Sequence, residues 1–144
     1  MATITITQEE FDALKANNDA RAQKGLSQFY WDQDLARDAQ NYANELASRN
    51  VLSHSSGTGQ GENLFWGGGD RTLSEAVDAW LAEERDYHNE AIGEGNFMQY
   101  GHYTQCMWKS TVRMAVAKAT ASNGSTYIVG RYTPQGNWTG QRPY

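Results

Sequence analysis

The sequence predicts a single α+β domain spanning residues 1–144, with helices first and antiparallel strands last. Three observations support this class. The chain has 144 residues, the length of one domain. A clear helical periodicity occupies residues 32–50, and two strand-like segments, 113–120 and 126–132, close the chain. Because helices and strands are segregated along the chain, an α+β layer fold is expected.

Helical signals mark the first half of the chain. Thr7 and Glu10 form a capping box that predicts a helix to about Gln23, which Gly25 ends. Phe11, Leu14 and Asn18 lie on one face of this helix. A second helix begins after Asp32 as N-cap and ends near Asn50. Its apolar residues recur at helical spacing: Leu35, Ala39, Tyr42, Ala43, Leu46 and Ala47.

The middle and end of the chain mix loops, short helices and strands. Residues 53–72 are rich in Ser and Gly around one short predicted strand, residues 64–66. A capping box at Thr72 and Glu75 starts a third helix, whose face carries Ala76, Trp80, Glu83 and Tyr87. A polar loop over 88–101 and a short helix over 103–108 follow. Asn123-Gly124 predicts a hairpin between the final strands.

Composition and charge exclude several functions. The net charge of −5, with no basic stripe, argues against nucleic-acid binding and against recruitment to anionic lipid. No apolar run reaches membrane-spanning length, so no transmembrane segment is expected. Residues 1–6 lack the basic and apolar regions of a signal peptide. We therefore expect a cytoplasmic protein or one peripheral to an intracellular membrane, and a secreted one if a signal has been removed.

Cys106 is the only cysteine, so no internal disulfide can form. A reducing compartment fits this best. The thiol is predicted to act as a small buried hydrophobic group rather than as a reactive nucleophile.

Three segments carry a family resemblance. They are Gly61–Leu64 (GENL), Gly101–Trp108 (GHYTQCMW) and Tyr132–Trp138 (YTPQGNW). In this order they resemble the CAP superfamily of cysteine-rich secretory, antigen 5 and plant pathogenesis-related class 1 proteins. With a single cysteine, the chain is closest in character to the Golgi-associated plant pathogenesis-related branch, which lacks the usual disulfides. The resemblance implies one CAP domain, a three-layer α-β-α sandwich around a small, mainly antiparallel sheet.

The same resemblance implies a central cavity. Carried over position by position, its lining residues are His54, Glu62, Glu83 and His102. Helical spacing does not separate Glu83 from Glu84, and Glu83 is chosen because the family places its acid three residues after the tryptophan that matches Trp80. Two imidazoles and two carboxylates could bind a divalent metal such as zinc, or could act as general acid and base.

Other residues have less specific interpretations. The third histidine, His88, is expected to be a solvated loop residue, while Tyr103 and Trp108 could either line the cavity or pack in the core. Pro134–Asn137 is predicted to be a structural turn, with Gly136 free to adopt positive φ.

Three functions remain open. CAP relatives bind fatty acids or sterols, and such a lipid could contact the first-helix face and the 88–101 loop through Leu14, Phe97, Met98 and Tyr103. An interaction or defence module would bind a partner protein through its surface, and a homodimer is also open. A metal-assisted hydrolase would use the His/Glu cavity, but no Ser-His-acid order is evident. The sequence therefore favours a non-catalytic protein that binds lipid or a partner protein.

Overall fold

The computed structural model describes residues 5–144. Residues 1–4, on which most of the targeting-signal prediction rests, lie outside the described part. The elements follow in the order α1 (Gln8–Gln23), β1 (Tyr30–Trp31), α2 (Gln33–Arg49), β2 (Gly61–Gly67), α3 (Leu73–Leu81), a 3₁₀ helix η1 (Ala82–Asp86), α4 (Phe97–Cys106), β3 (Arg113–Thr120) and β4 (Thr126–Thr133).

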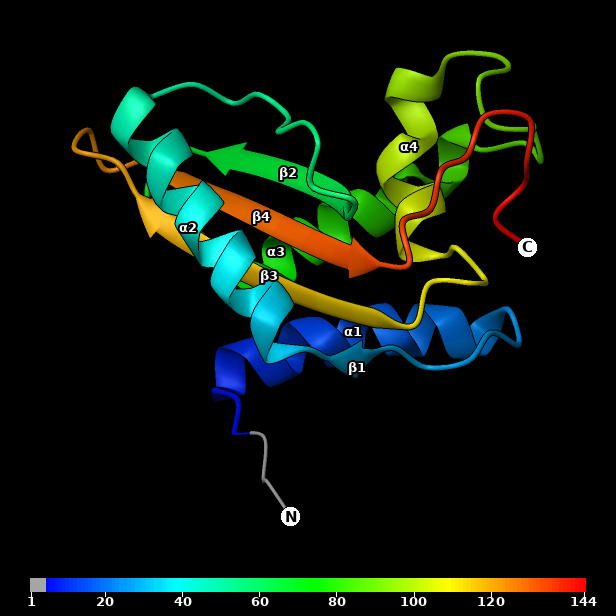
Figure 1. Ribbon diagram of the computed structural model, residues 1–144, viewed down its shortest axis with the longest axis horizontal. Coiled ribbons are helices and arrows are strands. Elements are labelled where there is room, and N and C mark those ends of the chain that lie inside the picture. The colour runs from blue at the N-terminus through cyan, green and yellow to red at the C-terminus, as the bar shows by residue number, and fades with distance from the viewer. Residues whose placement is uncertain (1–4) are drawn as a thin grey trace.

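The predicted three-layer α-β-α sandwich is confirmed. The sheet has the strand order β1-β3-β4-β2. The short strand β1, which the sequence did not reveal, runs parallel to β3, and the other neighbours are antiparallel. Helix α2 covers one face of the sheet, and Figure 1 shows α3 behind the opposite face. Strand β2 lies at the edge of the sheet, where α3 and α4 contact it.

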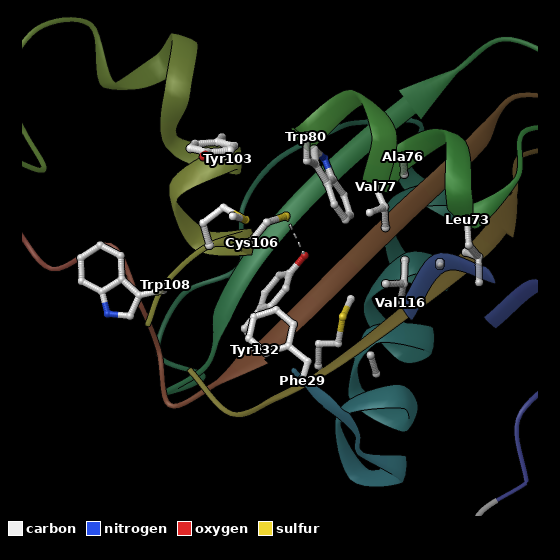
Figure 2. Packing of buried hydrophobic residues seen from close by; sticks show 14 of the residues in the cluster. Phe29, Leu73, Ala76, Val77, Trp80, Tyr103, Cys106, Trp108, Val116 and Tyr132 are labelled. Carbon is white, nitrogen blue, oxygen red and sulfur yellow. Dashed lines mark hydrogen bonds between the residues drawn. The ribbon is translucent and has the colours of Figure 1, made fainter. Parts of the chain in front are cut away.

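The core has one cluster on each side of the sheet. The α2 side is small and built mainly from alanines, with Leu46, Leu64 and Val129. The other side is larger and aromatic. Figure 2 shows Tyr132 pointing into that cluster near Phe29, with its hydroxyl 3.8 Å from the Cys106 sulfur. Successive residues of β4 point to opposite faces, which divides Val129 and Tyr132 between the two clusters.

The face of α1 that carries Phe11, Leu14 and Asn18 is not the most buried face of this helix. Phe11 is 47% exposed and Leu14 is half-buried, whereas Ala13, Asn17 and Arg21 are buried. The reason is that polar side chains of α1 bind the end of α4. The Arg21 guanidinium donates to the carbonyls of Cys106 and Trp108 at 3.2 and 3.0 Å, where cations stabilise a helix C-terminus. Burial lowers the pKa of Arg21 to about 10, so it stays charged at neutral pH.

The start of α4 also differs from the prediction. The predicted 88–101 loop is shorter, because α4 begins at Phe97 rather than near Tyr103. Gly101 lies inside α4, where a glycine weakens the helical signal of the sequence. A Cβ on Gly101 would lie 2.7 Å from the Phe97 ring, so this glycine lets the aromatic ring pack against the helix backbone. Phe97 and Met98 are thus first-turn helix residues and not loop residues.

The third helix is shorter than predicted. Its capping box at Thr72 and Glu75 is present, but α3 ends at Leu81 and continues as η1 to Asp86. Glu83 lies in η1, and its carboxylate contacts His102 of α4. The hairpin between β3 and β4 forms as predicted, with Gly124 at φ +87°.

Candidate functional site

The first His–Glu pair joins a loop to the edge strand. His54 lies in the loop after α2, and its Nδ1 is 2.8 Å from Oε1 of Glu62 on β2. The Glu62 carboxylate also accepts the backbone N–H of Ser55 at 3.0 Å and the Ser55 hydroxyl at 2.6 Å. Arg131 Nε completes the set at 3.0 Å from Oε2. The carboxylate is therefore held by four donors.

Arg131 and Glu62 meet because the strand register makes them direct cross-strand partners. Both side chains are buried, with 4% and 7% exposure. Burial raises the pKa of Glu62, but the hydrogen bonds from His54 and Ser55 and the charge of Arg131 outweigh it, so the pKa lies below its usual value. The carboxylate is ionised at neutral pH.

The second pair joins η1 to α4. His102 Nδ1 lies 2.6 Å from Oε2 of Glu83, and the backbone N–H groups of His102 and Tyr103 donate to Oε1 at 3.0 and 3.3 Å. The imidazole stacks on the Trp80 ring, with centroids 6.3 Å apart and planes at 24°. Glu84 instead pairs with Lys24 at 3.1 Å. Of the two adjacent acids, Glu83 is the one beside the histidine.

Both histidines line one small pocket of about 80 Å³. The lining comes from the His54 loop, β2, α4 and the C-terminal segment: His54, Glu62, Asn63, Phe97, Met98, Gly101, His102 and Asn137. A second, polar pocket of about 310 Å³ adjoins it and shares His54, Glu62 and Asn137. Of the four residues implied by the resemblance, His54, Glu62 and His102 line this pocket. Glu83 does not line it and is linked to it through its contact with His102.

The pairs leave the same nitrogen available on each ring. A carboxylate acceptor at Nδ1 makes that nitrogen the protonated one in the neutral ring, so Nε2 carries the lone pair. Within residues 5–144, no hydrogen bond involves Nε2 of His54 or His102. Among the same residues, no group of three or more His, Cys, Asp or Glu side chains is placed to hold a metal ion.

The four predicted lipid contacts are dispersed. Phe97 and Met98 line the small pocket, and Met98 is 83% exposed. Leu14 packs against the aromatic core cluster from α1, and Tyr103 is buried within it. The structure therefore brings only Phe97 and Met98 to the histidines.

Two polar residues outside the predicted set hold the pocket together. Asn63 Nδ2 donates to the His102 carbonyl at 3.0 Å. Asn137 accepts from Thr104 at 2.6 Å and donates to the Gly101 carbonyl at 2.9 Å, which ties the C-terminal segment to α4. Both lie inside the segments that carried the resemblance, but nothing in their spacing indicated these contacts.

The neighbouring turn corrects another prediction. Gly136 does not adopt positive φ; Asn137 does, at φ 60°. Gly136 is required for close packing instead, since a Cβ there would lie 2.6 Å from Trp108. Cys106 is buried as predicted, and burial raises its pKa to about 12, which makes it unreactive. No helix within residues 5–144 combines the length and apolar character needed to cross a membrane.

Comparison with known proteins gives one consistent family. The family model described as CAP, the cysteine-rich secretory protein family, matches residues 14–132. Pathogenesis-related leaf protein 4 of Solanum lycopersicum is 46% identical over 136 residues, which cover 92% of this chain and 82% of that protein. Golgi-associated plant pathogenesis-related protein 1 of Homo sapiens is 41% identical over 129 residues, covering 88% and 82%.

Solved structures share the fold of this chain. One described as "Crystal structure of NaASP2 with Zn2+" superimposes with a TM-score of 0.82 at 25% identity, covering 96% of this chain and 86% of the other. Another, described as "Crystal Structure of Na-ASP-1", has a TM-score of 0.83 at 23% identity. It covers 99% of this chain and 42% of the other.

Proposed function

The chain belongs to the CAP family, the cysteine-rich secretory protein family, and we propose that it binds a divalent metal such as zinc through His54 and His102. The observation that carries the proposal is the pairing of each Nδ1 with a carboxylate beside one pocket. Imidazoles that bind zinc usually donate their other N–H to a carboxylate or carbonyl, which fixes the ring and its free nitrogen.

The hydrogen bonds to each carboxylate indicate its role. Each oxygen of Glu62 already accepts two hydrogen bonds from the protein, so we assign this carboxylate to orienting His54 rather than to binding the metal. Glu83 plays the same part for His102. Two protein nitrogens leave the remaining coordination positions open to water or to a ligand, as in zinc sites that exchange ligands. A solved structure of 25% identity is described as "with Zn2+", which supports zinc as the metal proposed here.

Titration calorimetry with zinc tests the proposal. Wild type should bind with saturable heat, and His54→Ala/His102→Ala should not. His88→Ala is the matched control, because His88 is exposed outside the pocket. Affinity should weaken as the pH falls toward about 5, since protons compete for imidazole nitrogen. Equal affinity in wild type and the double variant would exclude the site.

A second candidate function is binding of a fatty acid or sterol at the same pocket. Phe97 and the exposed Met98 give it an apolar rim beside the histidines. The pocket of about 80 Å³ is much smaller than a typical ligand site of roughly 300–1,000 Å³. A lipid that entered this pocket would therefore have to widen it by moving one of the segments that line it.

Saturable binding of radiolabelled palmitate or cholesterol tests this candidate. Met98→Ser should weaken uptake, while Leu52→Ser, at another exposed apolar position, should not. Binding should change little with salt, because burial of apolar surface would drive it. Absence of saturable binding would leave the defence-type module that binds a partner protein, or a second copy of the chain, as the better account.

Catalysis is a weaker proposal. The Ser55 hydroxyl donates to Glu62 rather than to an imidazole, so no histidine activates it as a nucleophile. Ester or peptide hydrolysis that Glu62→Gln removes would revive the metal-assisted hydrolase. For location we propose a reducing compartment, cytoplasmic or peripheral to an intracellular membrane, because the one cysteine is buried and forms no bridge within the chain.

A further inference from the structure

The geometry points to Arg131 as the positioning residue for His54, acting through the Glu62 carboxylate and the loop that carries the histidine. This inference rests on the proposed metal-binding function for its biological meaning. Its geometric basis is independent of a metal, because it concerns which contacts hold an exposed imidazole in one orientation.

Arg131 first fixes the use of the two carboxylate oxygens. Its Nε and the Ser55 hydroxyl occupy Oε2 of Glu62, at 3.0 and 2.6 Å. Oε1 is thereby left to His54 Nδ1 and the Ser55 N–H, at 2.8 and 3.0 Å. Without Arg131 the carboxylate could rotate, and the acceptor facing the imidazole would no longer be defined.

Arg131 also contacts the supports of the loop. One terminal nitrogen donates to the Ser55 hydroxyl at 3.3 Å, and the other donates to Gln60 Oε1 at 2.7 Å. Its guanidinium lies over the Tyr42 ring, 5.3 Å from the centroid, and the Tyr42 hydroxyl donates to the Ser53 carbonyl just before His54. The Arg131 guanidinium thus contacts the Glu62 carboxylate, Ser55 in the His54 loop and Gln60 just before β2.

This arrangement requires an arginine in particular. A guanidinium presents several donors in a rigid fork, whereas an ammonium is a single point charge on a flexible stem. The imidazole has no comparable hold of its own, since the His54 side chain is 60% exposed. Its ring orientation and the nitrogen that carries the proton therefore depend on Glu62, and Glu62 depends on Arg131.

Nitrogen-15 NMR of the histidine rings tests the inference without metal. At about pH 8, where free imidazole is neutral, His54 in wild type should show protonated Nδ1 and bare Nε2. In Arg131→Met the two forms should mix. His102 should give the same signal in both proteins, because its carboxylate is held by different donors. Unchanged His54 signals in a folded Arg131→Met protein would overturn the proposal.

Zinc affinity gives the second measurement. Arg131→Met should lower it about 10- to 100-fold, the usual effect of removing a group that orients a metal ligand. Arg131→Lys keeps one charged contact and should lose less; it also carries the test if Arg131→Met does not fold. Arg113→Met is the control, since Arg113 is an exposed arginine on the neighbouring strand. Its affinity should match wild type.

A double-variant comparison separates positioning from general stability. In the His54→Ala background, adding Arg131→Met should cost no further zinc affinity, because there is no ring left to orient. A further loss there, with the fold intact, would contradict the assignment. If wild type binds no zinc, the metal proposal fails, and the NMR result alone decides the role of Arg131.

Discussion

In both His–Glu pairs the imidazole Nδ1 contacts a carboxylate, but different surroundings hold the two pairs in place. In the first, the carboxylate is buried and held by four donors, while the His54 side chain is 60% exposed on a loop. In the second, both side chains are partly buried, at 31% and 20%, and His102 is carried by a helix and stacked on Trp80. Both pairs hold the carboxylate, but only in the second is the imidazole itself also held, by the helix and by the Trp80 ring.

This difference shows where each pair is vulnerable. The first depends on a buried charge pair. Removal of either Arg131 or Glu62 leaves the other charge buried without a partner and should destabilise the whole fold. The second depends on packing of α4 against α3 and η1. Loss of the Glu83 carboxylate leaves no buried arginine unpaired, so it should destabilise the fold less. Buried ion pairs are costly to break from one side, because the remaining charge has no water to solvate it.

The largest expected effect is on stability. Glu62→Ala leaves the Arg131 guanidinium, only 4% exposed, without its counter-charge, and should lower the free energy of unfolding by about 3–5 kcal/mol. Glu83→Ala removes an acceptor for two backbone N–H groups and should cost about 1–3 kcal/mol. Urea unfolding measures both. Glu45→Ala, which breaks an exposed pair with Arg49, should change little. Equal losses at Glu62 and Glu83 would erase the proposed difference between the pairs.

The next largest expected effect is on zinc affinity, and it distinguishes one shared metal site from two separate ones. If His54 and His102 share an ion, wild type should bind one zinc per chain. Each single alanine variant should then lose at least about 100-fold in affinity, more than the 10- to 100-fold typical of residues that only orient ligands. The double variant should lose little beyond either single one. Calorimetric stoichiometry measures this. Two zinc ions in wild type and one in each single variant would mean that the pairs bind independently.

Sequence patterns predicted most of the fold because its elements have local signals. The capping boxes at Thr7 and Thr72 and the N-cap at Asp32 form as expected. The failures arise where tertiary contacts override the pattern. The apolar residues of α1 do not mark its most buried face, because Arg21 is buried against the Cys106 carbonyl of a distant helix. The start of α4 was missed because Gly101 packs against Phe97, a contact that single-residue helix propensity does not include.

The residues of the candidate site could be named only through the family resemblance. His54, Glu62, Glu83 and His102 lie far apart in the chain, and no spacing rule links them. Arg131 shows what was missed. An arginine inside a strand otherwise apolar on both sides is a signal that a buried partner exists, but identifying Glu62 requires the register of β2 on β4. Pairing between strands distant in sequence is information that local patterns lack.

The smallest expected effect is the response of the first pair to acid. Glu62 has a lowered pKa in the folded protein, so its contribution to stability is fully present above the ordinary glutamate pKa of about 4.3 and is lost as the pH falls through the lower folded value. Glu62→Gln carries no such charge. Wild type should therefore have a higher urea midpoint than Glu62→Gln near neutral pH, and the difference should narrow steadily from about pH 4.3 downward.

A Glu83→Gln series run in parallel shows whether acid weakening begins at the first pair. A wild-type to Glu62→Gln gap that stays constant down to about pH 3 would mean that Glu62 stabilises the fold by shape and neutral hydrogen bonding. The charge pair with Arg131 would then not distinguish the two sites.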